Sequence, residues 1–289
     1  SHRIVGHTRI ITLIYHDPAQ QFFITVSQDR TMKLWHRSSL TLIHTFKGHE
    51  KSVISADISP DRTLLASLSS DLSVRIWSLI NGACIHRFLN QESAQPTSLN
   101  FSSCGHYLAI SYDNGQIIIL SIQEIDHNNI SFKHQYFPIW KTALLHYPVS
   151  SCAFSPGGRL VAAALDTGLL AVFTVIGEKL WTVRVSDTRC DFCFFNPLVP
   201  SQIFACCSKN GVAILYEITN RLNLIRTFDT KPILKRKQSF LFALSCDSSI
   251  LYASSSTQLI AWSVLDAERP IAKIANLPTA MEMSPHPHI

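Results

Sequence analysis

The sequence predicts an all-β protein built as a β-propeller. Short apolar or alternating stretches rich in β-branched residues run through the chain, such as VISADIS, LLASLSS and SVRIW between residues 53 and 77. Turn residues such as Ser59-Pro60-Asp61 and Asn81-Gly82 separate them. A repeat of 42 residues gathers these strands into groups of four, which favours a propeller over a sandwich.

The repeat is clearest near the N-terminus. DRTMKLW at 29–35 and DLSVRIW at 71–77 each begin with Asp and end with Trp, and the two Asp residues are 42 positions apart. Gly6-His7 and Gly48-His49 share that spacing. Further repeats open at Asp113, Asp166, Lys209 and Ser256. Six repeats are therefore recognised in a single domain over residues 1–289, with an insertion at about 122–147.

A Gly-His pair that precedes a Trp and recurs every 40–45 residues resembles the WD repeat of β-propellers. The resemblance implies that a His, a hydroxyl of the second strand, an Asp and a Trp form a hydrogen-bonded set inside a blade. A buried His or Asp has to be paired, because an unpaired one is costly. The expected structural residues are His7, Asp29, Trp35, His49, Asp71, Trp77 and Trp262.

The hydroxyl of this set stays open between two positions in each repeat. Thr25 and Ser27 lie on one strand face, and so do Ser67 and Ser69. Repeats three and four retain Asp113 and Asp166 without the His and the Trp, so these two aspartates are expected in surface turns.

The two ends of the chain predict an incomplete last blade. HRIVGH at 2–7 is typical of the outer strand of a last blade, and PIAKIANL at 270–277 of the outer strand of blade six. AMEMSPHP at 280–287 then forms the inner strand of blade seven, and the last repeat is truncated from about 279. We therefore expect six recognisable repeats of a seven-bladed ring.

Beyond the repeat, several stretches resemble the WD-repeat domain of the bromodomain and WD-repeat / PH-interacting protein family. They are the run from His49 to Leu79, the insertion followed by VSSCAFSPGG at 149–158, Phe173, the Lys/Arg segment before blade six, and His286-Pro287. The resemblance implies a non-catalytic adaptor in chromatin-associated transcription regulation, located in the nucleus. The bromodomains of the family lie beyond its propeller, so no acetyl-lysine site is carried over.

Two alternatives to this function remain. Some members of the family are similar to substrate receptors of cullin-RING ubiquitin ligases, but the Trp-Asp-x-Arg signature of many such receptors is absent from WHRS, WSLI and WSVL. The chain could also be a cytoplasmic WD-repeat assembly component without any role in chromatin.

The composition and the motifs argue against several other classes. The net charge of +5 is spread over 289 residues, so direct nucleic-acid binding is not expected. No apolar run of 18 residues predicts a membrane span. G-x-S-x-G, G-x-G-x-x-G and a phosphate loop are absent, and we expect neither catalysis nor a cofactor. An enzyme with its site in the central channel would instead need convergent acids or histidines there.

The nearest approach to a metal motif is Cys190-x-x-Cys193, followed by Cys206 and Cys207. Zinc prefers four such ligands. If CDFC is a strand, however, residues three apart point to opposite faces, as do Cys206 and Cys207. The four thiols are therefore expected to be buried and inert, with no bound metal.

The function is expected to reside on the top face, which is formed by the loops between blades and the turns before third strands. Tyr and Arg are frequent anchors of protein interfaces. The candidate protein-binding residues are Arg9, Gln28, Lys51, Tyr112, Arg189 and Lys209. The expected partners are proteins or peptides, including chromatin proteins.

Overall fold

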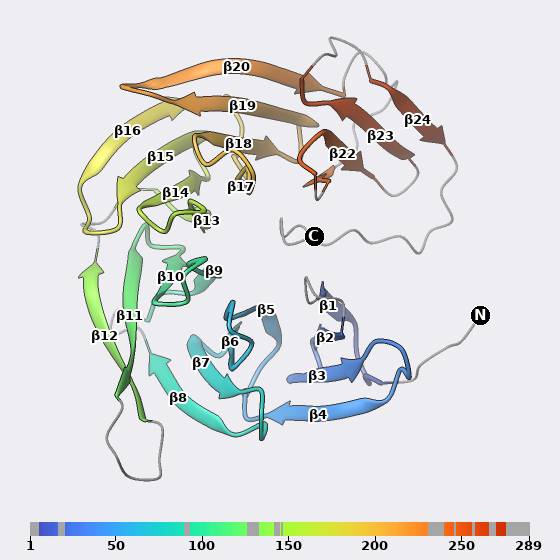
Figure 1. Ribbon diagram of the computed structural model, residues 1–289, viewed down its shortest axis with the longest axis vertical. Coiled ribbons are helices and arrows are strands. Elements are labelled where there is room, and N and C mark those ends of the chain that lie inside the picture. The colour runs from blue at the N-terminus through green and yellow to red at the C-terminus, as the bar shows by residue number, and fades with distance from the viewer. Residues whose placement is uncertain are drawn as a thin grey trace. The chain divides into compact units, whose positions relative to one another are not determined.

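A computed structural model describes residues 6–16, 21–89, 93–125, 133–141, 145, 147–230, 240–245, 247–255, 258–265 and 270–275 of the chain. These residues form six four-stranded antiparallel sheets, and each sheet is built from four strands in chain order (Figure 1). The chain divides between Leu145 and His146 into two compact units, and each unit contains three of the sheets.

The first unit holds three sheets. They comprise β1 (Ile11–His16), β2 (Phe22–Ser27), β3 (Thr31–His36) and β4 (Leu42–Lys47); β5 (Val53–Ile58), β6 (Leu64–Ser69), β7 (Ser73–Ser78) and β8 (Cys84–Leu89); and β9 (Pro96–Phe101), β10 (Tyr107–Tyr112), β11 (Ile117–Ile125) and β12 (Lys133–Lys141).

The second unit holds the other three. They comprise β13 (Val149–Phe154), β14 (Leu160–Leu165), β15 (Leu169–Thr174) and β16 (Lys179–Arg184); β17 (Phe192–Phe195), β18 (Gln202–Cys207), β19 (Val212–Ile218) and β20 (Leu222–Asp229); and β21 (Leu241–Leu244), β22 (Ile250–Ser254), β23 (Gln258–Ser263) and β24 (Ala272–Ala275).

The hydrophobic core of each unit lies between neighbouring sheets. In the first unit, Phe46 of β4 and Trp77 of β7 belong to one buried cluster, and Ile76 of β7 and Leu108 of β10 belong to the next. Alternate residues of β7 therefore enter different clusters, as the period of two in a strand requires. In the second unit, Phe204 and Trp262 share one cluster and Ile203 and Val172 share another.

In the second sheet the middle strand β6 is buried on both faces, whereas the fourth strand β8 is largely exposed. All six residues of β6 are buried. In β8 five residues are exposed and one is half-buried. This difference explains why LLASLS carries only small or apolar side chains while CIHRFL tolerates His and Arg.

The insertion predicted at 122–147 lengthens two strands of the third sheet. Strands β11 and β12 each have nine residues, and their pairing extends to Ile125 opposite Lys133. The remainder of the expected insertion lies largely outside the described residues. The same holds for residues 2–5 and 280–287, on which the expected partial seventh blade depends.

Candidate functional site

Four polar residues form a directed hydrogen-bond chain in the first sheet. The indole Nε1 of Trp35 donates to Thr25 Oγ1 at 2.9 Å, and this hydroxyl lies 2.7 Å from Nε2 of His7. The other ring nitrogen of His7, Nδ1, lies 2.8 Å from Oδ2 of Asp29. A carboxylate can only accept, so Nδ1 donates to Asp29 and Nε2 accepts from Thr25.

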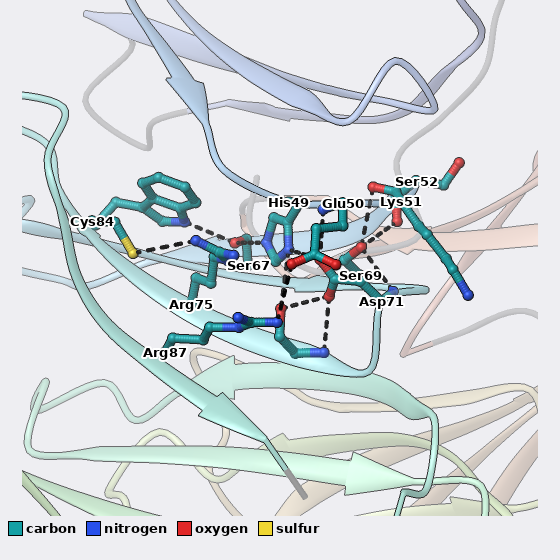
Figure 2. Close-up of polar contacts among 12 residues, drawn as sticks. His49, Glu50, Lys51, Ser52, Ser67, Ser69, Asp71, Arg75, Cys84 and Arg87 are labelled. Carbon is teal, nitrogen blue, oxygen red and sulfur yellow. Dashed lines mark hydrogen bonds and ion pairs between the residues drawn. The ribbon is translucent and has the colours of Figure 1, made fainter.

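The second sheet repeats this chain with Ser67 in place of Thr25. Trp77 Nε1 donates to Ser67 Oγ at 2.8 Å, Ser67 lies 2.8 Å from His49 Nε2, and His49 Nδ1 lies 3.0 Å from Asp71 (Figure 2). The hydroxyl that the sequence left open is thus the one four residues before the Asp.

The alternative hydroxyls have a different role. Ser27 donates to the carbonyl of Ile10 at 3.0 Å, and Ser69 donates to the carbonyl of Ser52 at 2.8 Å. Both therefore tie the second strand to the loop that enters the first strand of the same sheet.

The two carboxylates are ionised although they are almost fully covered. Burial by itself would raise the pKa of Asp29, but hydrogen bonds from Thr31, His7 and Thr8 outweigh it and lower this pKa to about 2. In the same way, bonds from Ser73, Glu50 and His49 outweigh burial and lower the pKa of Asp71.

The hydroxyls two residues after each Asp complete these sites. Thr31 donates to Asp29 Oδ1 at 2.6 Å, and Ser73 donates to Asp71 Oδ1 at 2.5 Å. The sequence analysis missed them, although the shared spacing of a hydroxyl at Asp+2 was visible in both repeats.

The carboxylates also hold the loops that lead into the first strands. Asp29 Oδ2 accepts the main-chain N–H of Thr8 at 3.1 Å, and Asp71 Oδ2 accepts that of Glu50 at 2.8 Å. The next residues along these loops are Arg9 and Lys51, and both are exposed. A buried frame of hydrogen bonds therefore fixes the backbone that presents two predicted contact residues.

The other two candidate contact residues of the first unit, Gln28 and Tyr112, are less exposed than Arg9 and Lys51. Gln28 is half-buried beside Asp29. The prediction that Tyr112 lies on the top face is wrong, because its side chain is 2 % exposed and packs in the core between the second and third sheets. Tyr112 shares one face of β10 with Leu108 and Ile110, which lie at alternate positions of the strand and enter the same cluster. Burial also raises the pKa of Tyr112 to about 12.

In the second unit, Arg189 is half-exposed but already paired. Its Nε lies 2.8 Å from Asp166 Oδ1 and 3.2 Å from Asp191 Oδ1. Asp191 in turn accepts a hydrogen bond from the main-chain N–H of Ser208 at 2.6 Å. The candidate residue Lys209 follows Ser208 and is exposed. The ion pair between Arg189 and Asp166 joins the turn of the fourth sheet to the loop that enters the fifth.

The aspartates of repeats three and four also differ from each other. Asp113 is exposed in its turn, as expected, and accepts the main-chain N–H of Gln95 at 2.9 Å. Asp166 is half-buried and bound by Arg189 and by Ser150, so it has a structural partner that the sequence did not predict.

The sixth sheet retains only the Trp of the motif within the described residues. Trp262 is 2 % exposed and packs edge-on against Phe228 of the neighbouring sheet, with the ring centroids 6.2 Å apart. The repeat anchor Ser256 lies outside the described residues.

Five cysteines of the second unit are buried among the described residues: Cys152, Cys190, Cys193, Cys206 and Cys207. The prediction that Cys190 and Cys193 point to opposite faces is wrong: β17 begins only at Phe192, and both thiols enter the same cluster with Cys207. Cys206 lies in the other cluster. Burial raises the pKa of Cys193 above its usual range. Within the described part of the chain, no group of three His, Cys, Asp or Glu could hold a metal ion.

Two arginines near the frame were not singled out from the sequence. Arg75 of β7 and Arg87 of β8 occupy directly opposite positions of adjacent strands (Figure 2). Their pairing depends on strand register, which the sequence alone does not determine.

None of the residues that the structure describes forms a helix with the length and hydrophobicity needed to cross a membrane.

Comparison with known proteins identifies the repeat and the fold. The model of the WD domain, G-beta repeat, matches residues 1–36 and 40–78. The chain is similar to the β-propeller domain of Cps50 (Swd1) from Myceliophteria thermophila, with 13% identity and a TM-score of 0.76 over 93% of this chain and 87% of that one. The predicted all-β WD40 propeller is confirmed, and the six sheets are its blades. WD40 propellers generally serve as protein-interaction scaffolds and are usually non-catalytic.

Proposed function

We propose that this chain is a non-catalytic scaffold that binds chromatin-associated proteins in the nucleus through the top face of its first unit. The observation that carries the proposal is the pair of loops held by Asp29 and Asp71 through main-chain hydrogen bonds. Residues on a loop that is fixed in the free protein lose little freedom on binding, which favours recognition of a partner.

The charge of this end of the first unit supports a protein ligand. Arg9, Arg30, Lys47 and Lys51 are exposed there, while Asp29 and Asp71 are almost fully covered by the frame. Exposed cations around a rigid centre steer partners of opposite charge. The covered carboxylates are engaged by histidines and hydroxyls, so they are structural and are not available as general bases.

The chromatin setting rests on the resemblance to the bromodomain and WD-repeat / PH-interacting protein family. It concerns the run at 49–79, the insertion after the third repeat and VSSCAFSPGG at 149–158. Because the family model matches the WD repeat in general, this finer assignment is part of the proposal.

The test is affinity capture from nuclear extract with the 289-residue chain as bait, read by mass spectrometry. We expect chromatin-associated transcription regulators with acidic segments to be enriched over a bait of equal net charge. Recovery of only cytoskeletal or translation proteins would contradict the chromatin setting and would favour a cytoplasmic assembly component.

A further inference from the structure

Two like charges face each other on the third and fourth strands of the second blade. Arg75 and Arg87 are direct partners in the register of β7 and β8. Facing side chains have Cβ atoms about 5 Å apart and point to the same face, and like charges in this position destabilise a sheet. The arrangement is therefore most favourable when an anion lies between the two guanidinium groups.

Arg75 is held in place with part of its hydrogen-bonding capacity unused. Its Cζ lies 5.9 Å from the centroid of the Trp77 ring, and a Cβ atom on Gly48 would lie 2.8 Å from its Nη1. Among the described residues, its buried Nε has no hydrogen-bond acceptor, and Nη1 donates only to the sulfur of Cys84 at 3.9 Å. A thioether or thiol sulfur is a weak acceptor.

Arg87 is only loosely paired. Its Nη2 lies 3.5 Å from Oε1 of Glu50, and the two side chains are 39% and 68% exposed. A charge-assisted hydrogen bond is shorter, about 2.7–2.9 Å. Together the two arginines and Glu50 carry one net positive charge, which a single carboxylate would balance.

The positive potential of this pair reaches the buried frame. Burial is the largest cause of the lowered pKa of His49, and the charges of Arg75 and Arg87 lower it further, against the opposing effect of Asp71.

The strand beside the pair provides a surface for an extended peptide. β8 is the last strand in the order β5-β6-β7-β8, so one of its edges is unpaired among the described strands. Leu89 lies two positions after Arg87 and is 57% exposed, whereas the register with β7 shifts at Ile85. Alternate residues of a regular strand share a face, so this face presents the basic side chain of Arg87 beside the apolar side chain of Leu89.

We propose that Arg75 and Arg87 form a binding site for one Asp or Glu side chain of a partner polypeptide that lies along β8. The complementary segment has the pattern x–x–acidic–x–apolar, and its main chain pairs with the open edge of the strand. The proposal names the partner chemistry of one site and rests on the proposed scaffold function.

The test uses a synthetic peptide library of this pattern whose central residue is Glu, Gln or phosphoserine. Each set is incubated with the immobilised 289-residue chain, and retained peptides are counted by mass spectrometry. We expect the Glu set to be retained about tenfold more than the Gln set, because the contact is charge-assisted. Raising the salt concentration should reduce this preference.

Two variants separate the site from a general charge effect. Arg87→Gln changes a side chain on an exposed strand, so the blade should fold, and it should abolish the preference for Glu. Arg37→Gln removes the same charge from the β3–β4 turn at the opposite end of the first blade and should leave the preference unchanged.

Equal retention of the Glu and Gln sets, or a Glu preference that survives Arg87→Gln, would overturn the proposal. Stronger, Arg87-dependent retention of the phosphoserine set would overturn the carboxylate assignment in favour of a phosphate. If no set is retained while the chain still captures nuclear proteins, the site is refuted and the scaffold function stands. If nuclear capture fails as well, both are refuted.

Discussion

The carboxylate of Asp71 accepts two hydrogen bonds, one from the main-chain N–H of Glu50 at 2.8 Å and one from Nδ1 of His49 at 3.0 Å. One side chain thus joins the buried hydrogen-bond chain of the second blade to the loop that carries Lys51. Stability of the blade and presentation of the surface are coupled at this residue.

Asp71→Asn tests that coupling. The neutral Asn side chain accepts weaker hydrogen bonds than the carboxylate, and its NH₂ group would face the donors that now bind Asp71. We therefore expect the unfolding free energy to fall by about 2–3 kcal/mol. The amide proton of Glu50 should also exchange faster with solvent. Measured by urea denaturation and hydrogen exchange, unchanged protection of Glu50 would contradict the role of Asp71 in holding the loop.

Trp77→Ala should destabilise the second blade by about 3–5 kcal/mol. The residue is 1 % exposed, and its ring packs against that of Phe46 with the ring centroids 5.8 Å apart. Trp77→Phe keeps an aromatic ring in the core but removes the donor to Ser67 and leaves a small cavity, so it should cost about 1–3 kcal/mol, less than the Ala variant. Chemical denaturation of both variants measures the difference. A loss below about 1 kcal/mol for the Ala variant would contradict the assignment of this ring to the core.

The stability of the protein should fall in two steps as the pH decreases. The pKa of His49 is lowered in the folded state, mainly by burial, so the unfolded chain binds a proton first and stability decreases below about pH 6.5. Asp29 has a folded pKa of about 2 against an ordinary 3.8, so its contribution is present above 3.8 and is lost as the pH falls through that interval.

The loss of unfolding free energy between pH 3.8 and about 2 amounts to about 2 kcal/mol for Asp29. Urea midpoints measured between pH 8 and pH 2.5 report both steps. In Asp29→Asn the lower step should shrink while the step near pH 6 remains. A stability that is constant from pH 8 to pH 5 would contradict a buried, neutral His49.

Gly168→Ala should damage the fourth blade. The residue has φ of +76°, and an added Cβ would overlap the carbonyl oxygens of Ser186 and Thr188. Strain of this kind costs about 1–3 kcal/mol before the loop is displaced. Gly157→Ala is the matched control, since a Cβ there meets no atom within 4 Å, and it should change the unfolding free energy by less than about 0.5 kcal/mol. Equal effects of the two substitutions would refute the close approach at Gly168.

The repeat made most of the fold predictable from sequence. The spacing of 42 residues located the strands of the first two blades and the polar residues His49 and Asp71. It could not choose between Ser67 and Ser69, because alternation places both on one face and only the position of the His decides.

The errors arise where burial or the start of a strand depends on the neighbouring elements. Tyr112 is buried because the middle strand β10 is covered on both faces, and Cys190 lies with Cys193 because β17 starts only after it. The facing position of Arg75 and Arg87 depends on register between strands, and the pairing of Arg189 with Asp166 depends on contacts between blades. Neither is encoded in a repeat period.

The most direct test of the central claim compares two double variants with identical charge change. Arg9→Glu/Lys51→Glu alters the loops held by Asp29 and Asp71, whereas Arg37→Glu/Arg62→Glu alters exposed turns at the opposite ends of the same blades. The binding of a nuclear partner captured by the unaltered chain is then measured by calorimetry. We predict that the first variant loses at least about tenfold in affinity and that the second retains it. Equal affinity of both variants, with folding intact, would contradict a binding surface on the top face of the first unit.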